Sequence, residues 1–214
     1  MGRWNPRLLD AKGREANWFW RRKFRTVDNG VKFDPGKYGW SWVPGTTSWV
    51  IPTAFTLVTL QQVRDMAFGE EPGISERIGL GLSMLLDRMC PGGGWNAGNS
   101  MAFGVPYAPY RDATSIALLG LSSQAHESGV QASLSWLAAR LAGCPSPYSL
   151  AWGILALTAY HKRNSEAADA LPCATDALNA AIGKGTNGLD TSTLAICLLA
   201  LEAVQGHNVF EVWR

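Results

Sequence analysis

The chain has 214 residues, of which 47% are hydrophobic, and a formal net charge of +2. This length suits one domain with a substantial core, and so small a net charge excludes recognition of a partner by overall charge. We expect neither a transmembrane segment nor a secretory signal, because no apolar run is long enough and the first residues are too charged. The four cysteines lack C-x-x-C spacing, so we expect free, mostly buried thiols in a cytoplasmic, reducing compartment.

The N-terminal segment, residues 1–35, combines basic and aromatic side chains. Residues 1–30 hold eight Lys or Arg against three Asp or Glu, and the stretch 18–25 interleaves aromatics with cations. We interpret this segment as docking its aromatic side chains on the rest of the chain, with its basic groups in water. Peripheral contact with a membrane surface is the alternative. We predict no nucleic-acid partner.

One short pattern returns four times along the chain and ends each time in leucine. The copies begin 61, 36 and 44 residues apart and cover residues 49–60, 110–121, 146–157 and 190–201. Each opens with a polar or aromatic entry and continues as a run of apolar residues almost without charge, which predicts a buried helix. Self-similarity of this kind is typical of repeat proteins, whose units bury their apolar faces by stacking.

The segments between the copies alternate polar and apolar residues at helical spacing. Residues 74–89 and 131–141 predict amphipathic helices, and residues 174–182 form a weaker example, which we expect Pro172 to interrupt or to start. Buried and amphipathic helices therefore alternate. The fold class that follows is all-α, an αα-toroid or partial toroid of helix pairs over residues 36–214, with apolar inner helices and amphipathic outer helices.

The connectors that enter the first two inner helices are rich in glycine and tryptophan. They read Tyr38-Gly-Trp-Ser-Trp-Val-Pro-Gly45 and Pro91-Gly-Gly-Gly-Trp-Asn-Ala-Gly98. A Gly-Gly-Trp connector before an apolar helix resembles the repeat of protein prenyltransferase β-subunits and squalene cyclases. The resemblance covers roughly residues 18–205 and is strongest over residues 36–121.

That resemblance implies parallel inner helices around a cavity that binds isoprenoid chains between aromatic side chains. Aromatic faces stabilise cations by roughly 0.5–2 kcal/mol each and suit an apolar tail. The alternative is that the connector tryptophans only hold helix pairs together. The candidate ligand-binding residues are Trp40, Trp42, Trp49, Trp95, Tyr107, Tyr110 and Trp152.

The acids of the resembled active sites are missing. Cyclases of this family carry Asp-x-Asp-Asp before Thr-Ala, and the aligned positions before Thr53-Ala54 are Trp49, Ile51 and Pro52. Isolated acids stand near the starts of two other inner helices, at Asp112 and Asp190. These two are the candidate catalytic acids, although a lone Asp at a helix start more commonly serves as an N-cap.

Metal and cofactor sites are not predicted either. Family prenyltransferases bind zinc through an Asp-x-Cys pair and a distant His, but the spacing from Asp87 to Cys90 is one residue too long. We expect the three histidines to be solvated, and no phosphate-binding glycine loop is present. The histidines are His126, His161 and His207.

Two functions follow from these features of the sequence. The first is a cyclase- or prenyltransferase-like repeat protein that binds or processes an isoprenoid or other apolar ligand, without proton-initiated cyclisation of squalene on its own. The alternative is a non-catalytic helical repeat module that binds a protein. About seven convincing helices would build only part of a toroid, so its exposed inner face favours a homodimer or a missing N-terminal half.

Overall fold

The computed structural model describes residues 33–66 and 72–212. In these ranges the prediction of an all-α chain is confirmed, because the only strands, β1 (Met101–Ala102) and β2 (Val105–Pro106), form one small hairpin. The basic-aromatic stretch 18–25 lies outside the described residues. The helices are α2 (Val50–Asp65), α3 (Pro72–Asp87), α4 (Arg111–Gly120), the 3-10 turn η1 (Ser122–Gln124), α5 (Ser128–Leu141), α6 (Pro147–Tyr160), α7 (Ser165–Gly183) and α8 (Thr191–Val204).

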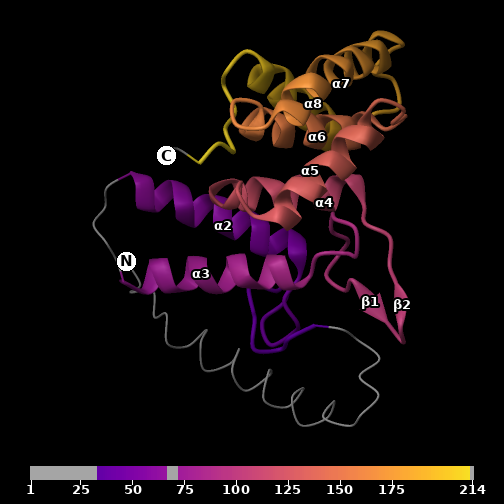
Figure 1. Cartoon of the computed structure of the whole chain (residues 1–214). Helices are drawn as coiled ribbons and strands as arrows, with labels where there is room; N and C mark the ends of the chain where they lie inside the picture. Colours follow the sequence, from indigo (N-terminus) through magenta and orange to yellow (C-terminus); the bar gives the residue numbers. More distant parts are fainter. Residues whose placement is uncertain (1–32, 67–71, 213–214) are drawn as a thin grey trace.

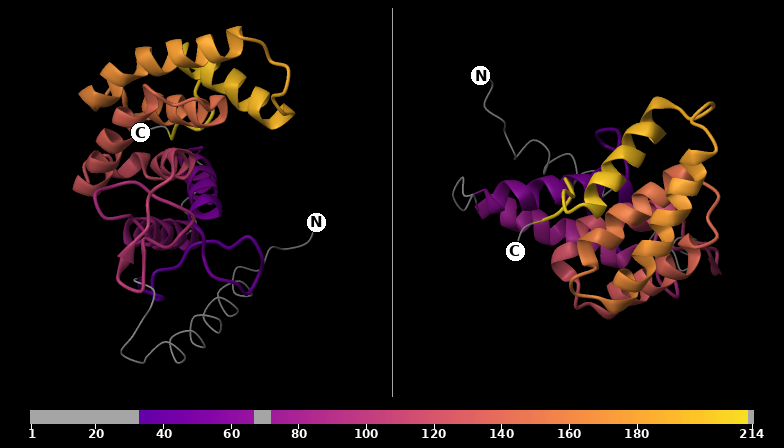
Figure 2. Two further views of the ribbon diagram at one scale, coloured as in Figure 1. Left: turned by 90° about the vertical axis from the view of Figure 1, so that its right-hand side faces the viewer. Right: turned by 90° about the horizontal axis from the view of Figure 1, so that it is seen from above.

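The helices form two rows (Figures 1 and 2). The four repeated segments become α2, α4, α6 and α8, and each of these inner helices packs on the next. The outer helices α3, α5 and α7 pack on α2, α4 and α6 in turn, and α5 also contacts α7. Helices α2 and α8 lie at opposite ends of the inner row (Figure 1). Closure of the row into a toroid stays a prediction.

Burial along the inner row depends on how many neighbours a helix has. In α6 every residue from Leu150 to Tyr160 is buried, and in α4 every residue from Ala113 to Gly120 is buried. Helices α2 and α8 bury one face only, since each ends the row and has an inner neighbour on one side. Low charge in the repeated segments is therefore required in the middle of the row, where no face of the helix meets water.

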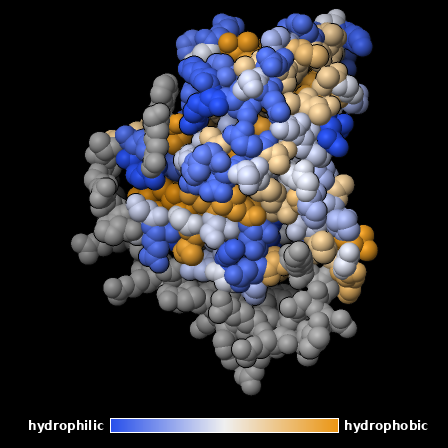
Figure 3. Space-filling model, viewed as in Figure 1, coloured by the Kyte–Doolittle hydropathy of each residue, from blue (hydrophilic) through white to orange (hydrophobic). Residues whose placement is uncertain are grey.

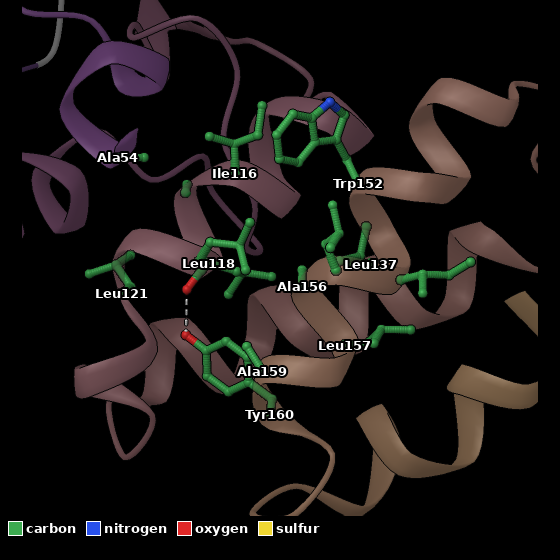
Figure 4. Close-up of a cluster of buried hydrophobic side chains, with 14 of the residues drawn as sticks. Ala54, Ile116, Leu118, Leu121, Leu137, Trp152, Ala156, Leu157, Ala159 and Tyr160 are labelled. Atoms are coloured by element: carbon green, nitrogen blue, oxygen red, sulfur yellow. Dashed lines mark hydrogen bonds between the residues drawn. The ribbon is translucent and has the colours of Figure 1, made fainter. Parts of the chain in front are cut away.

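Buried polar side chains join neighbouring inner helices. The hydroxyl of Tyr160 on α6 donates to the Leu118 carbonyl on α4 at 2.8 Å (Figure 4). The amide of Gln61 on α2 donates to the Gly120 carbonyl at 3.0 Å and accepts from the Ser123 hydroxyl at 2.6 Å. Burial raises the pKa of Tyr160, so it stays a donor throughout the physiological range.

The prediction for Pro172 is wrong. Helix α7 starts at Ser165, where the Asn164 side chain accepts a hydrogen bond from the Ala167 N–H at 2.8 Å, and continues past Pro172 to Gly183. Proline removes one intrahelical hydrogen bond and crowds the preceding turn, at a cost of about 3 kcal/mol, but Pro172 is exposed on an outer helix, where water reaches the freed carbonyl. The capped start of α7 and its packing on α5 and α6 therefore outweigh the tendency of Pro172 to end a helix.

Gly120 provides a test of the close approach between α2 and α4. A Cβ atom there would lie 3.0 Å from the Ala54 Cα and 3.1 Å from the Ala54 carbonyl oxygen, both backbone atoms. We expect Gly120→Ala to lower the free energy of unfolding by about 1–3 kcal/mol through overpacking. The matched control is Gly79→Ala on α3, where nothing lies within 4 Å and alanine should raise stability by about 0.5–1 kcal/mol. Urea unfolding measures the change in unfolding free energy for both variants. Equal changes would contradict the close approach of α2 and α4 at Gly120.

Candidate binding surface on the inner face

Trp40 and Trp95 form the same clasp in the first two repeats. The backbone N–H of each donates at 2.9 Å to the hydroxyl of a threonine in the next inner helix, Thr53 for Trp40 and Thr114 for Trp95. Each threonine hydroxyl also lies within hydrogen-bonding distance of the same tryptophan's carbonyl, at 3.3 and 3.2 Å. The two tryptophans thus position the connectors against α2 and α4.

The glycine before each tryptophan is required by this clasp. A Cβ atom on Gly39 would lie 2.3 Å from the Thr53 hydroxyl oxygen, and one on Gly94 would lie 2.9 Å from that of Thr114. Gly94 also has a φ of 80°, which other residues rarely adopt. The Gly-Trp motif is therefore explained by close contact between connector and helix, and Trp95 is fully buried with its indole N–H donating to the Leu85 carbonyl at 2.6 Å.

The other connector aromatics do not line a common cavity. Trp42, Trp49, Tyr107 and Tyr110 are exposed. Trp40 packs instead against Arg77, whose guanidinium lies 4.4 Å from its ring centroid. The structure therefore does not bring the seven predicted ligand-binding residues into one site.

Trp152 lies in an aromatic cluster on the inner row. Its ring centroid is 5.6 Å from that of Phe55 on α2, 6.3 Å from that of Tyr148 on α6 and 5.4 Å from that of Phe210. Phe55 and Phe210 were not predicted. Phe55 is the only aromatic residue inside α2, which is a signal that the sequence does offer, whereas nothing local distinguishes Phe210 beyond the last repeat.

Phe210 belongs to a segment that we call the C-terminal strap, residues 207–212. Gly206, with a φ of 96°, ends α8, and the strap then runs back across α6 toward α2 (Figure 1, yellow). The Asn208 amide donates to the Leu155 carbonyl at 2.9 Å and to the Thr158 hydroxyl at 2.7 Å. The Gln62 amide on α2 donates to the Val209 and Glu211 carbonyls at 2.9 and 3.1 Å.

The indole N–H of Trp152 has no acceptor. Its nitrogen is buried and without a hydrogen-bond partner in the described part of the chain. Figure 4 shows this nitrogen on the side of the ring away from Leu137 and Ala156. Buried indole N–H groups usually have a partner, so an acceptor that entered the aromatic cluster would satisfy this donor.

The two candidate acids have different environments. Asp190 is the N-cap of α8 and accepts hydrogen bonds from the Thr193 N–H at 2.9 Å, the Thr193 hydroxyl at 3.0 Å and the Ser192 hydroxyl. The Ser192 hydroxyl, the Thr193 N–H and the Thr193 hydroxyl lower the pKa of Asp190 to about 2. The group is ionised at neutral pH and exposed, so it cannot protonate an alkene.

The N-cap interpretation of Asp112 is wrong. The N-cap of α4 is Tyr110, and Asp112 is the second residue of the helix, where a negative charge favours the helix dipole without capping it. The cap position needs extended backbone, which the chain has at Tyr110, two residues earlier than the carboxylate. Asp112 and Asp190 stand on α4 and α8 with α6 packed between these helices, so they do not form one site.

The described residues contain no group of three His, Cys, Asp or Glu side chains arranged to hold a metal ion. His126 and His207 are exposed beside Glu127 and Glu202, with 3.6 Å between the closest nitrogen and oxygen of each pair. Cys90, Cys144 and Cys197 are buried free thiols, whereas Cys173 is exposed. No helix in the described ranges has both the length and the apolar character needed to cross a bilayer.

Comparison of the chain with family models, with curated proteins and with solved structures finds no match. The resemblance to the prenyltransferase and squalene-cyclase repeat therefore stays a prediction.

Asp190→Ala tests the ionised cap. Because the pKa of Asp190 is depressed in the folded chain, its stabilising effect is present above the unfolded value of about 4 and is lost as the pH falls toward about 2. We expect the variant to have a lower midpoint of thermal unfolding at pH 7, with a difference from the wild type that shrinks between pH 4 and pH 2. Asp190→Asn retains a capping oxygen, so its midpoint of thermal unfolding at pH 7 should fall by less than that of Asp190→Ala. A difference that is constant with pH would contradict the assignment.

Proposed function

We propose that this protein is a helical-repeat binding module whose inner face receives a peptide turn that carries an aromatic side chain. The observation that carries the proposal is the C-terminal strap, which occupies the inner face in that manner. Gln62 of α2 donates to two of its carbonyls, and the Phe210 ring packs against both Phe55 of α2 and Trp152 of α6.

The contacts of Gln62 suit peptide recognition because they involve main-chain atoms. One amide group donates to the carbonyls of residues 209 and 211, which lie two positions apart and bracket Phe210. Carbonyl contacts accept any sequence, whereas the aromatic cluster selects the side chain between them. Residues 208–211 form a turn, in which the Glu211 N–H donates to the Asn208 carbonyl at 3.0 Å, and this turn presents both carbonyls to Gln62. The main-chain hydrogen bonds then contribute affinity, and the aromatic side chain contributes specificity.

The strap would then compete with the partner. A binding surface that is occupied within its own chain is available only for the fraction of time that the strap is released, so the apparent dissociation constant rises by the inverse of that fraction. Phe210 is the aromatic anchor of the strap and is half-buried. Full burial of a phenylalanine side chain contributes about 1.5–3 kcal/mol, its contact with other aromatic rings adds about 0.5–1.5 kcal/mol, and every 1.4 kcal/mol changes a dissociation constant tenfold.

An isoprenoid or other apolar chain is the second candidate ligand. The rings of Phe55, Tyr148 and Trp152 present apolar faces from two inner helices, and the unpartnered Trp152 N–H would suit a hydroxyl or phosphate oxygen at the end of such a chain. Binding alone is proposed, because Asp190 is an ionised cap and the aligned positions Trp49, Ile51 and Pro52 carry no acid.

The test uses a fluorescein-labelled hexapeptide with the sequence of residues 207–212, His-Asn-Val-Phe-Glu-Val, and fluorescence anisotropy. We expect full-length Phe210→Ala to bind this peptide at least tenfold more tightly than the wild type, because its own strap loses the aromatic anchor. Adding Gln62→Ala to that variant should weaken binding. The matched control is Val209→Ala, which truncates an exposed strap side chain and should behave like the wild type.

A peptide with alanine in place of phenylalanine serves as the control ligand. Equal binding of the two peptides, or failure of Phe210→Ala to bind either, would contradict the proposal. Unlabelled farnesol is then added to the complex. Release of the labelled peptide by farnesol would favour the isoprenoid candidate, and retention of the peptide would exclude a shared site.

A further inference from the structure

The connector between α3 and α4 contains a long run without charge that is exposed over residues 103–108. Residues 89–110 include no Asp, Glu, Lys, Arg or His. Its base is held rigidly: Trp95 is buried, the Arg88 guanidinium donates to the Gly98 carbonyl at 2.8 Å, and the Tyr107 N–H donates to the Ser100 carbonyl at 3.0 Å. From this base the hairpin of β1 and β2 projects away from the helices (Figure 1).

Phe103 stands at the hairpin tip in an unfavourable backbone conformation. It is the one non-glycine residue with positive φ in the described ranges, at 50°, and Gly104 follows at 76°. Two positive φ values in a two-residue hairpin loop are the requirement of a type I′ turn, which strongly prefers Asn-Gly. The Phe103 side chain is 87% exposed, so packing against the described part of the chain does not explain its presence. Strain retained for an exposed apolar ring indicates an interaction outside the chain.

Polarity is ordered along the hairpin. Phe103 at the tip and Val105 beside it, 60% exposed, are fully apolar. Tyr107 and Tyr110, both exposed, follow closer to the helices, and Arg111 begins α4 behind them. The hydropathy surface shows an apolar protrusion at the right-hand edge of the molecule, over the hairpin (Figure 3).

We propose that this hairpin inserts its tip into the interfacial region of a lipid bilayer. The order of side chains matches the order of environments there, because apolar groups enter the acyl boundary and tyrosines lie at headgroup level. The shape also fits, since the surface is convex and a bilayer needs no complementary pocket. Because the hairpin carries no charge, we expect it to bind neutral lipid. Binding through the basic N-terminal segment would instead require anionic lipid.

The experiment is co-sedimentation of the full-length protein with vesicles of phosphatidylcholine alone, at 0.1 and 0.5 M salt. We expect the wild type to sediment with these vesicles, with little dependence on salt. The key variant is Phe103→Asn, which removes the ring and relieves the backbone. It should reduce the partition coefficient at least tenfold, and combining it with Val105→Ser should reduce it further.

The matched control is Leu198→Ser, which replaces another exposed apolar residue on α8 and should sediment like the wild type. Thermal unfolding of Phe103→Asn separates a lost contact from a damaged fold, because an Asn-Gly turn should leave the midpoint unchanged or higher. The proposal is overturned if the wild type stays in the supernatant with phosphatidylcholine, if Phe103→Asn sediments like the wild type, or if the hairpin instead mediates self-association that Phe103→Asn abolishes without any vesicle binding.

Discussion

The structure depends on one packing constraint, which is that each central inner helix must bury opposite faces against two neighbours. This constraint removes charge from α4 and α6 and requires small residues where backbones approach, as at Gly120 against Ala54. It also explains the buried polar bridges. A carbonyl at a helix end inside the row, such as those of Leu118 and Gly120, cannot reach water, so Tyr160 and Gln61 supply the donors.

The same constraint defines what happens at the ends of the row. Helices α2 and α8 each lack one inner neighbour, and part of the surface between the ends is covered by the C-terminal strap. Repeat proteins generally need some device at their termini, because an inner repeat is shaped to meet another repeat. The strap is such a device, because Asn208 and Gln62 attach the segment after α8 to α6 and to α2.

How much could be predicted from the sequence differs between local and long-range features. The four inner helices were predictable because apolar runs with little charge are a local pattern, and the Gly-Trp connectors were recognisable because two copies share one motif. Pro172 misled because its cost depends on exposure, which a local pattern does not contain. Asp112 misled because a cap is defined by backbone conformation rather than by residue type. Only part of the aromatic cluster could be predicted. Trp152 was predicted, but its partners Phe55 and Phe210 are 155 positions apart in the chain, and only the folded structure brings them together.

The two apolar surfaces, the aromatic cluster on the inner face and the tip of the hairpin, differ in whether the chain itself covers them. This difference suits them to different partners. On the inner face, the Phe210 ring packs against those of Trp152 and Phe55 and covers part of that surface. At the hairpin, Phe103 is uncovered although its backbone would favour another residue. A covered surface suits a partner that must compete, since the strap is present at a high effective concentration and rejects weak ligands. An uncovered tip suits a partner that is always abundant, because only the concentration of that partner, and no competitor within the chain, determines whether the tip is buried.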